Sequence, residues 1–294
     1  MTGIIIHGGA GAWIKAEPPE ALPPLEEAAK AGWQKLISGD SALDAVEAAI
    51  IILEDHPLFD AGYGSYLTEQ GEVELDAIIG DGTTFNFGAV AGVKHVKNPV
   101  RLARGILEHS DHNFFIGDGA EEFARRLGIE LIANLLLVSD REFSLFEKRD
   151  EQTVYGTVGA IALDNNGRLA VATSTGGTRR KPRGRVGDSS IWGAGAFANP
   201  TAAAGATGKG EQIMRVLLSQ IAVDFAQQGQ PASQAATSAI AKMLDLLPGA
   251  EAGLIMMDQN GNYGAAYSTE AMPVAWVDSD GTVHTTMNPD FGTG

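Results

Sequence analysis

The sequence predicts a globular fold that mixes α-helices with β-strands, and three observations support this prediction. Short apolar runs bounded by turn residues are interspersed with segments whose apolar residues repeat at helical spacing. Two pairs of such runs meet at Asn-Gly turns, Asn166-Gly167 and Asn260-Gly261, which is the pattern of a β-hairpin. Hydrophobic residues make up 44% of the 294 residues, which is ordinary for a globular protein. Both halves of the chain therefore combine paired strands with helices, in one or two domains.

Composition and charge exclude several classes of protein. The formal net charge is −16, from 21 basic and 37 acidic residues, which argues against nucleic acid as a general partner. The absence of cysteine excludes disulfides, a thiolate nucleophile and cysteine-ligated metal sites. No apolar run approaches the roughly 18 residues that a membrane helix needs, and the start of the chain lacks a signal-peptide pattern. We therefore expect a cytoplasmic protein without a membrane partner.

In the first half, β-branched runs and helical periods define the expected elements. Ile4-Ile5-Ile6 predicts a buried strand that leads into a glycine-rich loop at residues 7–11. Ser41, followed three residues later by Asp44, predicts a capped helix. Residues 139–152 are highly charged without a sustained period, which predicts an exposed, mobile linker. We also expect a proline-rich surface loop at 16–25, helices at 25–37, 99–109 and 119–127, and strands at 73–79 and 88–93.

The second half opens with a buried hairpin and continues with a basic run. The apolar run 158–163 predicts a strand that turns at Asn166-Gly167 into a second strand ending near Thr175. Five of the seven residues 179–185 are basic, which predicts a solvated loop and could also attract an anionic substrate. A helix is expected from Gly205 to Gln227, with a glycine-rich start that offers free N–H groups to an anion. Further expected elements are a strand at 191–198, a helix at 231–247 and a second hairpin at 254–258 and 263–269.

The bond between Gly156 and Thr157, at the mouth of the first hairpin, is a candidate site of self-cleavage. A threonine hydroxyl attacks carbonyls poorly unless a base takes its proton, and the α-amine of an N-terminal threonine is such a base. That amine has a pKa of roughly 8, so a useful fraction is neutral at cellular pH and no histidine is needed. Glycine at 156 tolerates a strained backbone and leaves its carbonyl open to attack. The pair on its own is also consistent with an ordinary β-branched residue that starts a strand.

The turn-rich loop from Leu53 to Ser65 is a candidate cation site. Such loops can wrap a hard cation with backbone carbonyls. From the residues alone, a plain connection between two elements is the simpler interpretation, and His56 is a surface residue rather than a ligand.

Eight short motifs are spread over nearly the whole chain. They are His7-Gly8-Gly9-Ala10-Gly11, Leu75-Asp76-Ala77, Gly88-Ala89-Val90-Ala91-Gly92-Val93, Asn98-Pro99-Val100, Gly156-Thr157-Val158-Gly159-Ala160, Thr173-Ser174-Thr175-Gly176-Gly177, Gly184-Arg185-Val186-Gly187-Asp188-Ser189 and Thr207-Gly208. Together they resemble the plant-type asparaginase or isoaspartyl peptidase family of N-terminal nucleophile hydrolases. The resemblance implies an α+β fold, a four-layer αββα sandwich. It also implies self-cleavage into residues 1–156 and 157–294 of a single domain, and a dimer of cleaved αβ units, which is a heterotetramer.

The resemblance implies a role for each matching residue. Thr157 matches the nucleophile and Thr175 the threonine that orients it. Arg185 matches the residue that holds the substrate α-carboxylate, and Asp188 the one that holds its α-ammonium.

Further matching positions complete the implied site. Thr207 and Gly208 match the pair that contacts the carbonyl under attack, and Gly210 joins the substrate-binding set. Asparagine and β-aspartyl dipeptides share this geometry, so the expected substrate is a small amide or dipeptide and no catalytic cofactor is needed. The implied carbonyl ligands of a structural sodium ion are Leu53, Glu54, His56, Phe59, Ala61 and Tyr63.

Two residues depart from the family pattern. Asp60 stands where asparagine is usual, and an ionised aspartate cannot donate the hydrogen bond that asparagine can. Lys209 stands where a small residue is usual, and we hypothesise that Lys209 pairs with Asp60 and restores neutrality beside Thr157. The basic run is also heavier than usual, which favours acidic peptide ends over free asparagine.

Two rival interpretations remain open from the sequence. A glycosylasparaginase shares the Thr-Val-Gly start but has aspartate before the threonine, where this chain has Gly156. An uncleaved, catalytically silent homologue acting as a scaffold is the other rival. A fragment that starts at Thr157 on N-terminal sequencing distinguishes the hydrolase from the scaffold.

Overall fold

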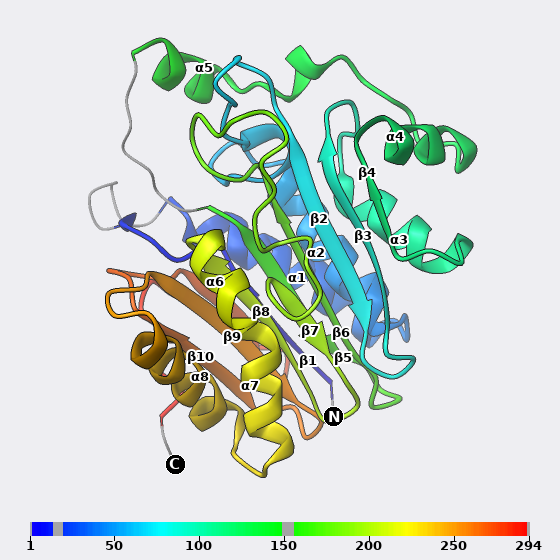
Figure 1. The fold of residues 1–294 in the computed structure, drawn as a ribbon. Helices are drawn as coiled ribbons and strands as arrows, with labels where there is room; N and C mark the ends of the chain where they lie inside the picture. Colours follow the sequence, from blue (N-terminus) through cyan, green and yellow to red (C-terminus); the bar gives the residue numbers. More distant parts are fainter. Residues whose placement is uncertain (1, 14–19, 149–155, 293–294) are drawn as a thin grey trace.

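Two β-sheets lie face to face, and helices cover their outer faces (Figure 1). This description comes from a computed structural model and covers residues 2–13, 20–148 and 156–292. The larger sheet has the strand order β12-β11-β1-β5-β6-β2-β3-β4, and the smaller has the order β10-β9-β8-β7. The strands of the larger sheet are β1 (Gly3–His7), β2 (Leu75–Asp81), β3 (Asn86–Val93), β4 (Phe114–Ile116), β5 (Val158–Leu163), β6 (Leu169–Thr175), β11 (Val274–Val277) and β12 (Val283–Thr286). Those of the smaller sheet are β7 (Ala196–Ala198), β8 (Ala202–Gly208), β9 (Ala252–Asp258) and β10 (Tyr263–Tyr267).

The helices complete a four-layer α+β sandwich in the order αββα, as the family resemblance implies. Helices α1 (Leu22–Ile37), α2 (Ala42–Glu54) and α3 (Pro99–His109) pack on the larger sheet, and α4 (Gly117–Arg126) lies beside α3 and β4. Helices α7 (Leu218–Gln227) and α8 (Ala232–Leu246) pack on the smaller sheet, after the short helix α6 (Gly210–Val216). Between the two sheets lies an apolar core that includes Ile5, Ile161, Val171, Ile255 and Met257.

The predicted hairpins and most of the predicted helices are confirmed. The β5–β6 hairpin turns at Gly167, where φ is +73°, and Asp164 Oδ1 accepts hydrogen bonds from the turn at Asn166 N (2.8 Å) and Arg168 N (3.1 Å). Helix α2 begins with the predicted capping box between Ser41 and Asp44. The helices at 25–37, 99–109, 119–127 and 231–247 and the strands at 73–79 and 88–93 lie within two or three residues of their predicted bounds.

Three predictions need correction, for residues 139–152, 191–198 and 205–227. Helix α5 (Asp140–Glu147), capped by Ser139, occupies most of the segment expected to be an exposed linker, and its Glu142 is buried. Residues 149–152 of that segment lie outside the described residues. The expected helix from Gly205 to Gln227 is strand β8 followed by α6 and α7, which meet at Leu217 with φ +54°. The expected strand at 191–198 is reduced to β7 at its end.

Tertiary packing explains these differences. The alanine-rich run of β8 has high helix propensity, but its small side chains let the smaller sheet approach β5 and β6 closely. Pro23 and Pro24, expected in a surface loop, occupy the first turn of α1, where a missing N–H costs no hydrogen bond. The strands β4, β11 and β12 were not predicted. Among the described helices, none has both the length and the apolar character needed to cross a membrane.

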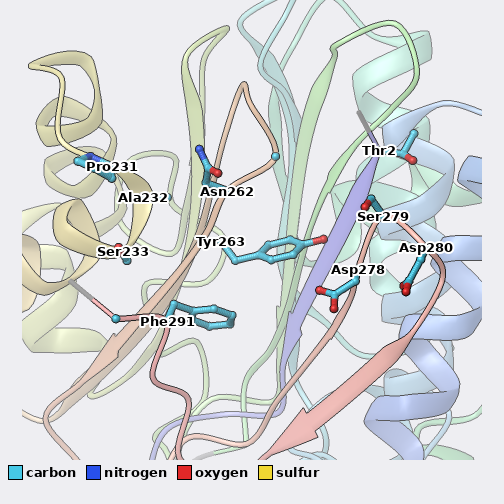
Figure 2. Close-up of a pocket in the computed structure, with 12 residues that line it drawn as sticks. Thr2, Pro231, Ala232, Ser233, Asn262, Tyr263, Asp278, Ser279, Asp280 and Phe291 are labelled. Atoms are coloured by element: carbon cyan, nitrogen blue, oxygen red, sulfur yellow. The ribbon is translucent and has the colours of Figure 1, made fainter. Parts of the chain in front are cut away.

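A cavity of about 740 Å³ lies at one edge of the molecule, between β10, the turn that joins β11 to β12 and the start of α8 (Figure 2). Tyr263 spans this region and donates a hydrogen bond from its hydroxyl to the Val277 carbonyl (2.6 Å). Asp278, which lines the cavity, pairs with His284 (2.7 Å). No residue predicted for the functional site lines this cavity, so the candidate site lies elsewhere.

Candidate active site

Thr157 and Thr175 face each other where the β5–β6 hairpin opens. The antiparallel register pairs Val158 with Ser174, so the next positions outward are Thr157 and Thr175. The Thr157 hydroxyl donates a hydrogen bond to the Thr175 hydroxyl, with 3.1 Å between the two oxygens. Thr157 is only 8% exposed. The local sequence of one hairpin therefore brings the predicted nucleophile and its orienting residue into contact.

Asp60 continues this line of polar contacts. Its Oδ2 lies 3.3 Å from the Thr175 hydroxyl oxygen, and its Oδ1 accepts a hydrogen bond from the Tyr66 N–H (2.8 Å). A second N–H, from Gly177, donates to the Thr175 hydroxyl (2.9 Å). Asp60 thus lies two hydrogen bonds from the predicted nucleophile.

Glycines bring the backbone close around Asp60. A Cβ on Gly156 would lie 2.6 Å from the Asp60 backbone nitrogen, and a Cβ on Gly176 would lie 2.5 Å from Asp60 Oδ1. Asp60 is therefore enclosed by the residue before the nucleophile and the residue after Thr175. Burial raises the pKa of Asp60 to about 8, against the opposing effects of the Tyr66 N–H bond and of nearby positive charge.

The positive charges near Asp60 are Lys181 and Arg179, not Lys209. Lys209 forms an ion pair with Glu251, and its backbone N–H also donates to the Glu251 carbonyl (2.9 Å). The hypothesis that Lys209 pairs with Asp60 is therefore wrong. Lys209 follows β8 directly, so the β8–β9 pairing directs it to the residue that precedes β9.

Arg185 and Asp188 form the predicted substrate clamp around Gly210. A Cβ on Gly210 would lie 2.8 Å from Asp188 Oδ1 and 3.0 Å from Arg185 Nη2, so only glycine leaves this space open. A Cβ on Gly177 would lie 3.3 Å from Arg185 Nη1, which connects the clamp to the end of β6. Asp188 Oδ2 is buried and has no hydrogen-bond partner among the described residues. Such an orphaned carboxylate oxygen is suited to an ammonium group.

The Arg185 guanidinium holds a carboxylate of this chain. Its Nε and Nη2 donate to the two carboxylate oxygens of Glu211, each at 2.7 Å. Glu211 stands in for the carboxylate that a substrate would present, and the planar two-bond geometry is the one Arg185 would offer to it. The sequence reasoning did not identify Glu211.

Thr207 and Gly208 lie at the end of β8, which packs against β5 and β6. Thr207 is fully buried, and its hydroxyl accepts a hydrogen bond from the Ala10 N–H (3.2 Å), which ties β8 to the glycine-rich loop after β1. Gly208 has φ +132°, and a Cβ there would lie 2.5 Å from the Glu251 carbonyl oxygen. The predicted pair is therefore held at the end of the smaller sheet by both neighbouring elements.

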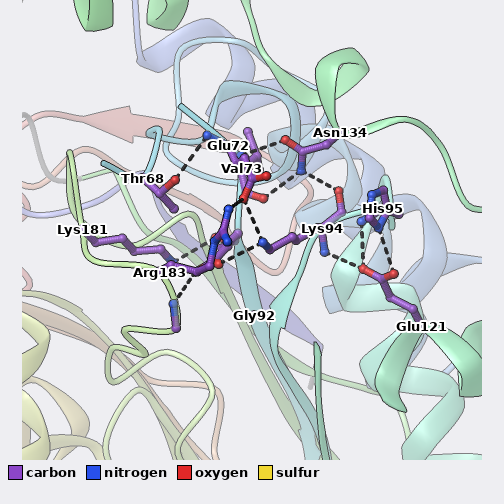
Figure 3. A network of polar contacts seen from close by, with 12 residues as sticks. Thr68, Glu72, Val73, Gly92, Lys94, His95, Glu121, Asn134, Lys181 and Arg183 are labelled. Carbon is purple, nitrogen blue, oxygen red and sulfur yellow. Dashed lines mark hydrogen bonds and ion pairs between the residues drawn. The ribbon is translucent and has the colours of Figure 1, made fainter. Parts of the chain in front are cut away.

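Basic side chains of residues 179–185 bind acceptors within the protein, and Figure 3 shows this for Lys181 and Arg183. Lys181 is 2% exposed and donates to the Glu74 carbonyl (3.0 Å), and Arg183 pairs with Glu72 (2.7 Å). Arg179 pairs with the buried Glu142 of α5 (2.8 Å). The expectation of a solvated loop is therefore wrong for Arg179 and Lys181, whereas Arg183 is exposed as expected. A preference for acidic peptides stays a prediction, with less unpaired positive charge to support it.

The candidate sodium loop joins the end of α2 to the short helix η2 (Gly62–Gly64). Leu53 and Glu54 end α2, Ala61 precedes η2 and Tyr63 lies within it, while His56 and Phe59 occupy the turn between. Gly62 has φ +52°, and a Cβ there would overlap the Glu54 carbonyl oxygen, so the loop folds tightly over that carbonyl. Carbonyl oxygens in a tight loop fit a hard cation such as sodium. No cluster of His, Cys, Asp and Glu able to hold a metal is present in residues 2–13, 20–148 and 156–292.

Comparison with known sequences identifies the family of the chain. The sequence model of the family described as asparaginase matches residues 1–287. The chain belongs to the asparaginase family. A plant-type L-asparaginase of Pyrococcus furiosus is 41% identical over 94% of this chain and 96% of its own length. The human isoaspartyl peptidase/L-asparaginase is 39% identical over 99% of this chain and 97% of its own length. The mouse protein of that name is 41% identical over 93% of this chain and 87% of its own length.

In this asparaginase-family site, the burial of two side chains, His7 and Lys181, was not predicted from the sequence. His7 is fully buried, and a Cβ on Gly159 would overlap its ring. Burial lowers the pKa of His7 to about 3, so the ring is neutral at cellular pH. Lys181 was assigned to a solvated run because its neighbours are basic. Only the fold shows that it points inward, since nothing in the local pattern distinguishes it from Arg180 or Arg183.

Proposed function

We propose that this protein hydrolyses β-aspartyl dipeptides and L-asparagine, with Thr157 as the nucleophile. The observation that carries the proposal is the convergence of three groups. They are the Thr157–Thr175 hydroxyl contact, the Arg185 guanidinium in a carboxylate-binding geometry, and the orphaned oxygen of Asp188. Relatives named for both activities, at about 40% identity, support the same substrates.

The proposed reaction follows from these positions. Arg185 holds the α-carboxylate of the aspartyl unit and Asp188 its α-ammonium, which presents the side-chain amide to Thr157. The free α-amine of Thr157 takes the hydroxyl proton as the oxygen attacks the amide carbon. Thr207 and Gly208 contact the oxygen that becomes negative. The leaving amine departs with the proton, and water then cleaves the ester to release aspartate.

The α-amine becomes available only after the chain cuts itself between Gly156 and Thr157. Glycine at 156 supports this step, because the close approach of Asp60 leaves no room for a side chain there. We further propose that the two pieces stay together as an αβ unit and that two units associate. A sodium ion held by the carbonyls of the loop after α2 would have a structural role.

Replacement of Thr157 tests the proposal. Wild-type protein should separate into two bands on a denaturing gel, and N-terminal sequencing should identify a fragment that starts at Thr157. It should also release aspartate from a β-aspartyl dipeptide. Thr157→Ala should remain one band and release none. An intact wild-type chain without hydrolysis would support the silent scaffold instead. Faster hydrolysis of a glycosylated asparagine than of the dipeptide would support the glycosylasparaginase alternative.

A further inference from the structure

Self-cleavage needs a proton acceptor that the proposed hydrolysis does not supply. In the precursor, the nitrogen of Thr157 belongs to the peptide bond that breaks, so it cannot act as a free amine. The Thr157 hydroxyl still has to lose its proton to attack the Gly156 carbonyl. This inference rests on the proposed function and concerns the group that takes the proton.

The hydrogen bonds around Thr175 fix the direction in which its hydroxyl points. A hydroxyl has one proton to donate and two lone pairs to accept with. Thr175 accepts from the Gly177 N–H (2.9 Å) and from the Thr157 hydroxyl (3.1 Å). Both lone pairs are therefore used, and its own proton is directed to Asp60 Oδ2 at 3.3 Å. The contacts run in one direction, from Thr157 through Thr175 to Asp60.

Asp60 is held in the position that this direction requires. The Tyr66 N–H donates to its other oxygen, Oδ1, at 2.8 Å, which leaves Oδ2 facing Thr175. Asparagine could accept the same hydrogen bond through its amide oxygen, but it could not take a proton. The carboxylate at position 60 therefore has a capacity that an asparagine at this position would lack.

We propose that Asp60 accepts the Thr157 proton through the Thr175 hydroxyl during self-cleavage. As Thr157 Oγ1 bonds to the Gly156 carbonyl carbon, its proton passes to Thr175, and the Thr175 proton passes to Asp60. The bond from that carbon to the Thr157 nitrogen then breaks, and Asp60 returns the proton through Thr175 to the departing nitrogen, which becomes the amine. The product is an ester, which water splits into the Gly156 carboxylate and the free hydroxyl and α-amine of Thr157. Asp60 acts through Thr175, so it is a positioning residue rather than one that touches the reacting atoms.

The charged groups around Asp60 come from three elements. Lys181 and Arg179, from the loop after β6, favour the ionised carboxylate, and Glu142 of α5 opposes it. The Tyr66 phenol lies close enough for the charge of Asp60 to raise its pKa further, beyond the effect of burial. Burial is the largest influence on Asp60 and raises its pKa to about 8. A base with a pKa near the working pH is the most effective one, because it is both available and strong.

His7 is another buried titratable side chain near Thr157, and it is a poor candidate for this step. Its ring packs on Gly159, and the hydrogen bond between this ring and the Thr157 backbone does not involve the hydroxyl that reacts. Its lowered pKa of about 3 makes it a weak base. The Thr157 hydroxyl contacts Thr175, which leads to Asp60, so Asp60 rather than His7 is the proton acceptor that the contacts favour.

The test compares Asp60→Asn with a matched variant, Asp76→Asn. Asp76 is fully buried and lies opposite Thr175 in the β2–β6 pair, but its Oδ1 accepts from the Gly92 N–H (2.9 Å). Freshly purified precursor of each protein is incubated over a range of pH, and the cleaved fraction is followed on denaturing gels. The wild-type cleavage rate should rise as the pH passes through about 8, where Asp60 ionises. Asp60→Asn should cleave about 100-fold more slowly and lose this rise, whereas Asp76→Asn should keep it.

The pH profile distinguishes proton transfer from a structural effect. The proposal would be overturned if the Asp60→Asn protein cleaved at the wild-type rate. It would also be overturned if this protein cleaved more slowly but its cleavage rate still rose at the same pH as in the wild type. If Asp76→Asn also lost the rise of the cleavage rate with pH, the loss would reflect the removal of any buried negative charge, and the proposal would be overturned. The cleaved Asp60→Asn protein should lose less in kcat on a β-aspartyl dipeptide than it loses in cleavage rate, because its α-amine is then free. A wild-type protein that neither cleaves nor hydrolyses would overturn the proposed function and this step with it.

Discussion

The pairing of Arg185 with Glu211 predicts that substrate has to displace a carboxylate of the protein. Two nitrogens of Arg185, Nε and Nη2, donate to Glu211 at 2.7 Å each, and the Arg185 side chain is only 14% exposed. Glu211, however, is 62% exposed in its side chain, so water screens the attraction and the pair is worth about 0.5 to 1 kcal/mol. Removing the competing charge with Glu211→Gln should therefore lower KM by about two- to fivefold and leave kcat unchanged.

Initial rates on a β-aspartyl dipeptide, measured at low and at high salt, check this prediction. Salt weakens the competing pair, so the difference in KM between wild type and variant should shrink as salt rises. Glu251→Gln is the matched control, because Glu251 also forms an ion pair at the start of α6, with Lys209, but does not contact Arg185. A rise in KM in Glu211→Gln would refute the reasoning. It would mean that Glu211 orients Arg185 for the substrate instead of competing with it.

Four further outcomes follow from the geometry. Thr175→Val keeps the shape but removes the hydroxyl that contacts Thr157 and relays its proton to Asp60, so self-cleavage should slow by about 100-fold on denaturing gels. Burial raises the pKa of Asp188 from 3.8 to about 7, so its carboxylate forms only as the pH rises, and KM should fall about tenfold per unit up to pH 7 and then level off. Gly156→Ala places a Cβ 2.6 Å from a backbone nitrogen, so the precursor should stay uncleaved on a denaturing gel. Glu142→Gln leaves Arg179 buried without its carboxylate, and urea unfolding should show a loss of about 3 kcal/mol.

The fold could be predicted where a local pattern and tertiary packing agree. The β5–β6 hairpin has a turn at Gly167 that requires positive φ, flanked by apolar runs, and both signals are local. Strand β8 was missed because its alanines favour a helix in isolation, and only the opposing sheet makes small side chains an advantage there. Helix α5 was missed because its charged residues were assumed to face water. Its Glu142 is instead buried against Arg179, a residue 37 positions away.

The site could be predicted as a set of residues but not as a network. Thr157 and Thr175 follow from the hairpin register, so their contact is implied once the hairpin is recognised. The partner of Asp60 could not be found in this way. Lys209 and Lys181 are equally basic in the sequence, and the choice between them depends on which strand ends lie side by side. Which positive charge lies near Asp60 therefore depends on the fold, although each of these charged residues is visible in the sequence.

The strand order explains how a chain cut at Gly156 can remain one folded unit. Strands β5 and β6 follow the cut, yet they lie between β1 and β2, which precede it. Hydrogen bonds of β1 to β5 and of β2 to β6 therefore join the two pieces along both sides of the hairpin. The buried pair of Arg179 and Glu142 adds a contact between the loop after β6 and the helix before the cut. Separation of the pieces would break both strand pairings and expose the apolar core beneath them, so the proposed cleavage would free the Thr157 amine while the sheet that positions it persists.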